Sequence, residues 1–218
     1  RSNVCSVSKK KVDYKKLSSD DIEAMKGHML DMSVKQYQNI DGGNITRGPI
    51  ARFVKKKTMG VIFFDEELVV GEDTVWNIKL LDQGGNIVVA YEQWYFYAQN
   101  EASVTHKYDE NMKEYIADKL YAVQKLVEIH PELQKNYNAL MVEEITSRLI
   151  KSFLLHNDNV MSYREKKMYL KNFLKENPFK EIYQFHVRFN KTGIKLLFIK
   201  LDLILPLYIV WRNIKHEN

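Results

Sequence analysis

Apolar residues recur at helical spacing near the start of the chain. Residues 18–21 are two serines and two aspartates, a typical capping sequence, and apolar residues follow them at intervals of three and four. This pattern predicts a helix from about Ser19 to Gln38. The helix is expected to stop before the turn-forming residues 41–44, which include two glycines.

The second half of the chain shows the same spacing almost without interruption from residue 109. It predicts helices over 111–129, 131–155 and 162–176, with Pro131 in a first turn, where proline is tolerated. The helical share of the fold is therefore expected to exceed the strand share.

Strand patterns are confined to the part of the chain before residue 108. A short apolar run at 61–64 precedes an acidic turn at 65–67, and β-branched and aromatic residues dominate 86–90 and 93–97. Between them, residues 73–83 carry apolar side chains on one face and predict a helix that ends at two glycines. These patterns together predict a helix-dominated α/β fold.

The last apolar segment, residues 194–211, differs from the others because charges interrupt it. It is apolar enough for lipid, but two lysines, an aspartate and Pro206 lie within it, so a membrane-spanning helix is not expected. Tyr208, Trp211 and Arg212 near its end are typical of a helix lying in a membrane interface. A core helix or a dimer interface fits the same pattern.

Composition limits the classes of protein that this chain could be. The 218 residues suffice for one core with an appendage, and the single cysteine, Cys5, excludes an internal disulfide framework. The net charge of +5 is modest, and its lysines and arginines do not form a nucleic-acid-binding module, so no nucleic-acid partner is expected. Because the chain begins with Arg1 and residues 1–16 lack a signal peptide, we expect it to be part of a larger protein.

Most strong catalytic motifs are absent, and one acidic cluster stands out. The six histidines have no metal-ligand spacing, no Asp-x-Asp occurs, and no glycine loop for phosphate is present, so no metal site is predicted in this chain. Glu72 and Asp73, however, follow Gly71 directly before the helix predicted at 73–83. On the residues alone, Asp73 is an N-cap and Glu72 a solvated carboxylate.

A series of motifs in the same region changes that interpretation. They are, in order, a basic helix start at 51–56, Phe64 to Leu68, Gly71 to Thr74, an apolar strand at 87–90, Tyr95 to Tyr97, and Ser103 to Thr105. In order and spacing, residues 45–108 resemble the family-two glycosyltransferases of bacterial polysaccharide synthesis. The resemblance implies a fragment of the GT-A fold, the nucleotide-diphospho-sugar transferase fold, with an appended helical bundle.

The resemblance also implies roles for individual residues. The catalytic base would be Asp73 with Glu72 beside it, and the substrate-binding residues would be Arg52, Tyr95, Tyr97 and Ser103. Arg52 stands where the family usually has lysine, which keeps the charge and changes the geometry. Other interpretations stay open: a surface cation for Arg52, sheet-face packing for the two tyrosines, and a turn cap for Ser103.

Cofactor, partners and location follow from the same resemblance. We expect a nucleotide-sugar donor, a glycan or lipid-linked acceptor, and a divalent cation (Mg or Mn) that the missing N-terminal half would bind. Residues 1–108 would be the acceptor side of the catalytic domain, 109–190 a helical region, and 191–218 an amphipathic tail. That tail would hold the protein at the inner, cytoplasmic face of the membrane or form a homodimer, and the alternative function is a non-catalytic helical adaptor.

Overall fold

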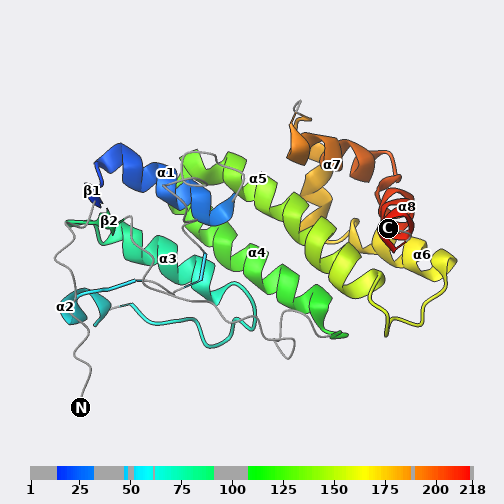
Figure 1. Ribbon diagram of the computed structural model, residues 1–218, viewed down its shortest axis with the longest axis horizontal. Coiled ribbons are helices and arrows are strands. Elements are labelled where there is room, and N and C mark those ends of the chain that lie inside the picture. The colour runs from blue at the N-terminus through cyan, green and yellow to red at the C-terminus, as the bar shows by residue number, and fades with distance from the viewer. Residues whose placement is uncertain are drawn as a thin grey trace, which may run out of the picture.

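The computed structural model describes residues 14–31, 47–48, 52–60, 62–90, 108–187 and 190–216. Among these residues the chain is built mostly of helices, and the only sheet is a pair of short antiparallel strands. Figure 1 shows α4 and α5 along the middle of the molecule, with α1 and α3 beside one end and α7 and α8 at the other. The predicted dominance of helix over strand is confirmed.

The elements in chain order are β1 (Tyr14–Lys16), α1 (Ser19–Leu30), α2 (Lys56–Met59), α3 (Glu72–Asp82), β2 (Val88–Ala90), α4 (Met112–Ile129), the 3₁₀ turn η3 (Pro131–Leu133), α5 (Gln134–Glu143), the π-helical η4 (Glu144–Leu154), α6 (Tyr163–Phe173), the 3₁₀ helix η5 (Phe179–Gln184), α7 (Lys191–Lys200) and α8 (Ile204–His216). The helices predicted from residue 109 onward are therefore confirmed, with bounds shifted by a few residues. The run predicted over 131–155 is one continuous helical segment of three geometries.

Helix α1 begins where the capping sequence predicted. The Ser18 hydroxyl accepts the Asp21 N–H, and the Asp21 carboxylate accepts the Ser18 N–H at 3.0 Å, which completes a capping box. The predicted end at Gln38 is wrong, because the helix stops at Leu30 and Asp31 is extended. Leu30 at this end is fully covered, and α1 packs against α3 and α5.

The cap makes the stability of α1 dependent on pH. Hydrogen bonds from Lys15 and Ser18 lower the pKa of Asp21 from 3.8 to about 2. Because the folded pKa is depressed, the contribution of Asp21 is complete above the unfolded value and is lost as the pH falls through about 2. Asp21→Ala is expected to lower the thermal midpoint, measured by circular dichroism, at pH 6, and the difference from the unsubstituted protein should shrink below pH 4.

Asp20→Ala is the matched control for Asp21→Ala, because it removes a charge from the same turn without breaking the box. It should show little of this pH dependence. A difference for Asp21→Ala that stays constant down to pH 2 would contradict the assignment.

The two strands join the ends of the first half of the described chain. Tyr14 pairs with Ala90 and Lys16 with Val88, and the Leu17 N–H donates to the Ile87 carbonyl. The strand predicted at 86–90 is thus confirmed over its last three residues. The one predicted at 93–97 lies outside the described residues.

The strand predicted at 61–64 is wrong over the residues that are described. Residues 62–65 form no strand, and they pack across α3 as a loop. Ile62 is buried, while the Phe64 ring stacks on the buried Trp76 ring of α3 at a centroid distance of 5.0 Å. The apolar run therefore covers a helix instead of pairing with a strand. The acidic turn that follows is confirmed by the Asp65 carboxylate, which accepts the Glu67 N–H.

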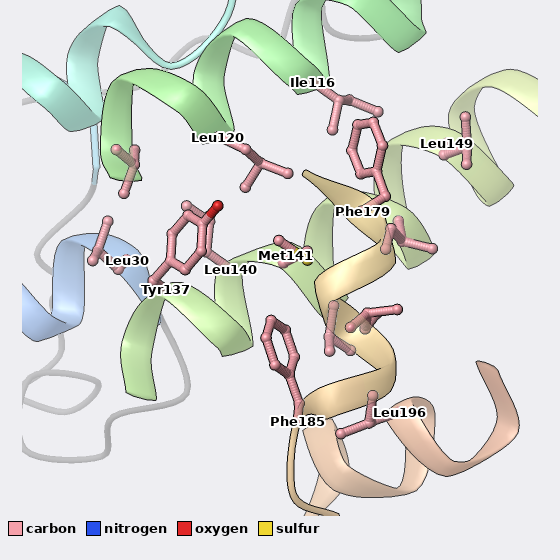
Figure 2. Close-up of a cluster of buried hydrophobic side chains, with 14 of the residues drawn as sticks. Leu30, Ile116, Leu120, Tyr137, Leu140, Met141, Leu149, Phe179, Phe185 and Leu196 are labelled. Carbon is pink, nitrogen blue, oxygen red and sulfur yellow. The ribbon is translucent and has the colours of Figure 1, made fainter. Parts of the chain in front are cut away.

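One apolar core holds these elements together. Figure 2 shows side chains of α4, α5, η5 and α7 meeting around Tyr137, Leu140 and Met141 of α5. Buried residues of this core come from 1–108, 109–190 and 191–218 alike, since Leu30, Leu120 and Leu196 all belong to it. The three parts proposed from the sequence, 1–108, 109–190 and 191–218, all contribute residues to this core.

The C-terminal apolar segment forms two helices, not the single helix that its composition suggested. The chain turns between α7 and α8 at Asp202, which has a positive φ of 57°. Pro206 then falls in the first turn of α8, where its missing N–H costs no helical hydrogen bond. A continuous helix would have put Pro206 in its interior, so the break is the less costly arrangement.

Candidate active site

The predicted acidic pair lies at the first turn of α3. Gly71 has the left-handed conformation (φ 91°), and α3 begins at Glu72, with Asp73 as its second residue. Asp73 is therefore not the N-cap, because Gly71 occupies that position and offers no side chain. The Asp73 Oδ1 accepts the Thr74 N–H at 2.6 Å and lies 3.3 Å from the Thr74 hydroxyl. Glu72 and Asp73 are both partly exposed.

Two hydrogen bonds connect Arg52 to the start of α3 through residues 47–48. The buried Asn77 amide of α3 donates to the Asp73 carbonyl at 2.7 Å and to the Arg47 carbonyl, which holds residues 47–48 against α3. The Arg52 guanidinium donates in turn to the Gly48 carbonyl.

Two opposing effects act on the positive charge of Arg52. Burial lowers the pKa of Arg52, and the Asp73 carboxylate opposes this by stabilising the guanidinium. Arg52 and Asp73, two residues assigned to the site from the sequence, are thus close enough to interact electrostatically. Arg52 is half-buried, so it is not an isolated surface cation.

A buried ion pair lies behind the turn. Lys119 of α4 and Glu144 of η4 are each 3% exposed, and Lys119 Nζ lies 2.7 Å from Glu144 Oε1. The stem of Lys119 passes directly under Gly71, since a Cβ at residue 71 would lie 2.6 Å from Lys119 Cγ and Cδ. The turn that presents Glu72 and Asp73 therefore sits on a lysine whose charged end is held in the core.

Other charges complete this buried network. Burial alone would raise the pKa of Glu144, but the positive charges of Lys119, Arg148 and Arg47 outweigh burial and hold it below its ordinary value. The Arg148 Nε lies 3.0 Å from Glu144 Oε2, and Arg47 bridges Glu143 and the Leu30 carbonyl. Glu144 is thus ionised and compensated from several sides.

Sequence analysis did not identify Lys119 and Glu144, although a signal was present. Lys119 stands next to Leu120 on the apolar stripe of α4 that includes Ile116, and Glu144 stands next to Ile145 on that of the following helix. A charged residue on an apolar stripe requires a buried partner. Two such residues of opposite sign on neighbouring helices indicate an ion pair.

The remaining predicted residues do not enter this geometry. Tyr95, Tyr97 and Ser103 lie outside the described residues, so the structure does not bear on their roles. The described residues line a hollow of about 300 Å³ beside Trp211 and another of about 210 Å³ beside Arg148. Neither hollow is lined by Glu72 or Asp73.

A group of possible metal ligands lies at the opposite end of α3. Ligand atoms of Glu23, His130 and Glu132 come within 4.8 Å of one another. The Lys26 ammonium, however, lies 2.8 Å from Glu23 Oε1 and 2.6 Å from Asp82 Oδ1, so Glu23 already has a cationic partner within the protein. Asp82 is also nine residues from Asp73, about 13 Å along the helix, which separates this group from the acidic pair.

Comparisons with models of protein families, with curated proteins and with solved structures found no match to this chain. The function is therefore inferred from the motifs of the sequence and from the geometry at the start of α3.

Proposed function

We propose that this chain is the acceptor-side, C-terminal portion of an inverting glycosyltransferase of the GT-A type. It would transfer a sugar from a nucleotide-sugar donor to a glycan or lipid-linked acceptor in cell-surface polysaccharide synthesis. The observation that carries the proposal is the first turn of α3, where Gly71 presents two adjacent, partly exposed carboxylates on a rigid buried support. The electrostatic interaction between Arg52 and Asp73 adds to it, because the family-two resemblance assigns both residues to one site.

In the proposed reaction an acceptor hydroxyl attacks the anomeric carbon of the donor sugar. A new carbon–oxygen bond forms on one face while the bond to the diphosphate breaks on the other, which inverts the configuration. The hydroxyl proton passes to the Asp73 carboxylate, and the nucleoside diphosphate leaves with the electron pair of the broken bond. The divalent cation expected in the donor half would stabilise that leaving group.

The geometry of Asp73 suits a base of this kind. Its Oδ1 is occupied by Thr74, whereas no other described side chain bonds to Oδ2, so one oxygen can receive the acceptor hydroxyl. A carboxylate is a weak base, and Asp73 lies at the N-terminal, positive end of the α3 dipole. A weak base suffices if the proton leaves late, when the attacking oxygen has already become acidic. Glu72 would hold or assist the acceptor from the same turn.

In this proposal the donor half belongs to another part of the same protein. Among the described residues the one sheet is a two-stranded antiparallel pair, whereas binding of a nucleotide in a GT-A fold uses a parallel sheet. The proposal also places the protein in the cytoplasm at the inner face of the membrane, where nucleotide-sugar donors are used.

The proposal is tested by assaying the chain alone and joined to its upstream sequence with a panel of nucleotide sugars. We expect no transfer by the 218 residues alone and transfer by the longer protein, with the product of opposite anomeric configuration by NMR. Turnover by the chain alone would contradict the assignment of half a site. A product with retained configuration would exclude Asp73 as the base of a single displacement.

A non-catalytic helical adaptor is the second candidate, favoured by exposed apolar side chains on α7 and α8. In that case Glu72 and Asp73 would only stabilise the N-terminal end of α3. The two functions differ in what a substitution of Asp73 does, since only a transferase loses turnover.

A further inference from the structure

Helices α7 and α8 carry a set of large apolar side chains in contact with water. Each of these side chains is at least two-fifths exposed, and they lie within 18 residues of sequence. We call them the α7–α8 apolar surface: Ile194, Leu197, Leu201, Leu203, Leu207, Val210 and Trp211. Figure 1 shows both helices together at the end of the molecule opposite α1.

The core does not account for this surface. Leu196 and Ile199 of α7, and Ile204, Leu205 and Tyr208 of α8, already fill the inner sides of the two helices. Ile194, Leu197 and Leu201 follow one another at helical spacing on the other side of α7, as Leu207, Val210 and Trp211 do on α8. Both helices are therefore apolar on two sides, and the side chains on the outer side are two-fifths or more exposed.

The described charged side chains of the same segment are mostly positive. Over residues 190–212 they are those of three lysines and one arginine, against Asp202 alone. Asp202 is itself paired, since its Oδ2 lies 3.2 Å from Lys167 Nζ. The surface is thus apolar with a positive rim.

A hollow of about 300 Å³ opens where the rim meets the end of α8. Its lining includes Lys151, His156, Tyr208, Trp211 and Arg212. The Lys151 ammonium lies 5.2 Å from the Tyr208 ring centre and 5.1 Å from that of Trp211. Arg212 is held in place by bonds of 2.6 Å to the Leu155 carbonyl and 2.5 Å to Asn157 Oδ1. Two cations and two aromatic rings at one hollow are suited to an anionic group.

We propose that the α7–α8 apolar surface docks on an anionic lipid bilayer, with a lipid phosphate seated in the hollow beside Lys151 and Arg212. Leucines would enter the acyl region, Trp211 would lie at headgroup level, and the lysines would face the anionic charge. None of the described helices is long and apolar enough to cross a membrane, so the contact is peripheral.

Charge decides between a bilayer and a second copy of the chain. A symmetric dimer through this surface would bring the same positive rim from each copy together, and like charges repel. An anionic bilayer supplies the opposite charge over the whole surface. The proposal does not depend on sugar transfer, because membrane docking can be measured without a donor.

The experiment is co-sedimentation of the chain with vesicles of neutral phosphatidylcholine, with and without about one-third phosphatidylglycerol. We expect binding to the anionic vesicles that falls with salt. The double variant Leu197→Ser/Leu207→Ser should lower this binding at least about tenfold through lost apolar contact. Lys151→Gln should lower it about fivefold, as expected for one cation near an anionic surface.

Matched variants away from the surface serve as controls. Ile129→Ser/Val69→Ser removes two apolar side chains that are at least as exposed, and Lys125→Gln removes an exposed cation of α4. Both should bind vesicles like the unsubstituted chain, and thermal melting should show that every variant is folded.

Three results would overturn the proposal. One is the absence of binding to anionic vesicles, and another is equal loss in the control variants. The third is a dimer by light scattering that Leu197→Ser/Leu207→Ser converts to a monomer, which would assign the surface to a second copy. None of these results bears on sugar transfer by the longer protein, so the docking proposal and the proposed function can fail independently.

Discussion

Lys119→Met is expected to lower the free energy of unfolding by about 3–5 kcal/mol, the usual cost of breaking a buried ion pair from one side. The substitution leaves the Glu144 carboxylate 3% exposed, with its 2.7 Å partner gone and Arg148 as the nearest remaining cation. Urea unfolding followed by circular dichroism measures the loss. Lys125→Met, at an exposed position of the same helix, should change the stability by less than about 0.5 kcal/mol.

A second variant separates the ion pair from simple packing. Lys119→Met/Glu144→Leu removes both charges, and replacing a buried pair by apolar residues of similar volume is often neutral. The double variant should therefore recover most of the stability lost in Lys119→Met. If it were as unstable as the single variant, the loss would come from the shape of the core and not from an uncompensated charge.

The ion pair also supports the proposed site. The Lys119 stem lies under Gly71, so this lysine supports the turn before Glu72. The positive φ of Gly71 disfavours any other residue at that position. Methionine at position 119 keeps a stem of similar length, so the double variant should leave the turn supported.

Asp73→Asn is expected to lower the turnover of the longer, donor-binding protein by about 10²–10⁴-fold, the range typical of a lost general base. Asparagine keeps the shape of the side chain, and its oxygen can still accept the Thr74 N–H, so α3 should begin as before. The measurement is the initial rate of nucleoside diphosphate release at saturating donor and acceptor.

Two carboxylates near Asp73 provide the controls. Glu67→Gln changes an exposed side chain in the loop before α3 and should leave the rate within about threefold. Glu72→Gln should fall between the two, because Glu72 shares the turn without carrying the proton. A normal rate for Asp73→Asn, with unchanged melting, would favour the helical adaptor.

The sequence by itself determined the features that depend on neighbouring residues. The start of α1 follows from the side chains of its capping box. The bounds of α3, predicted within one residue, lie next to glycines at 71 and 84–85. The acidic pair was found in the same way, because Glu72 and Asp73 adjoin Gly71 in the chain. The dominance of helix followed from apolar spacing, which is also local.

Tertiary structure decided what depends on residues far apart in the chain. Phe64, in the run predicted as a strand, stacks on Trp76 instead, and α1 ends at Leu30, before its predicted end. Lys119 meets Glu144 across 25 residues, and Asn77 draws the segment before Arg52 to Asp73 across 30. Such contacts form only when separate helices pack, and the energy of burying a charge or an aromatic ring then outweighs local preference.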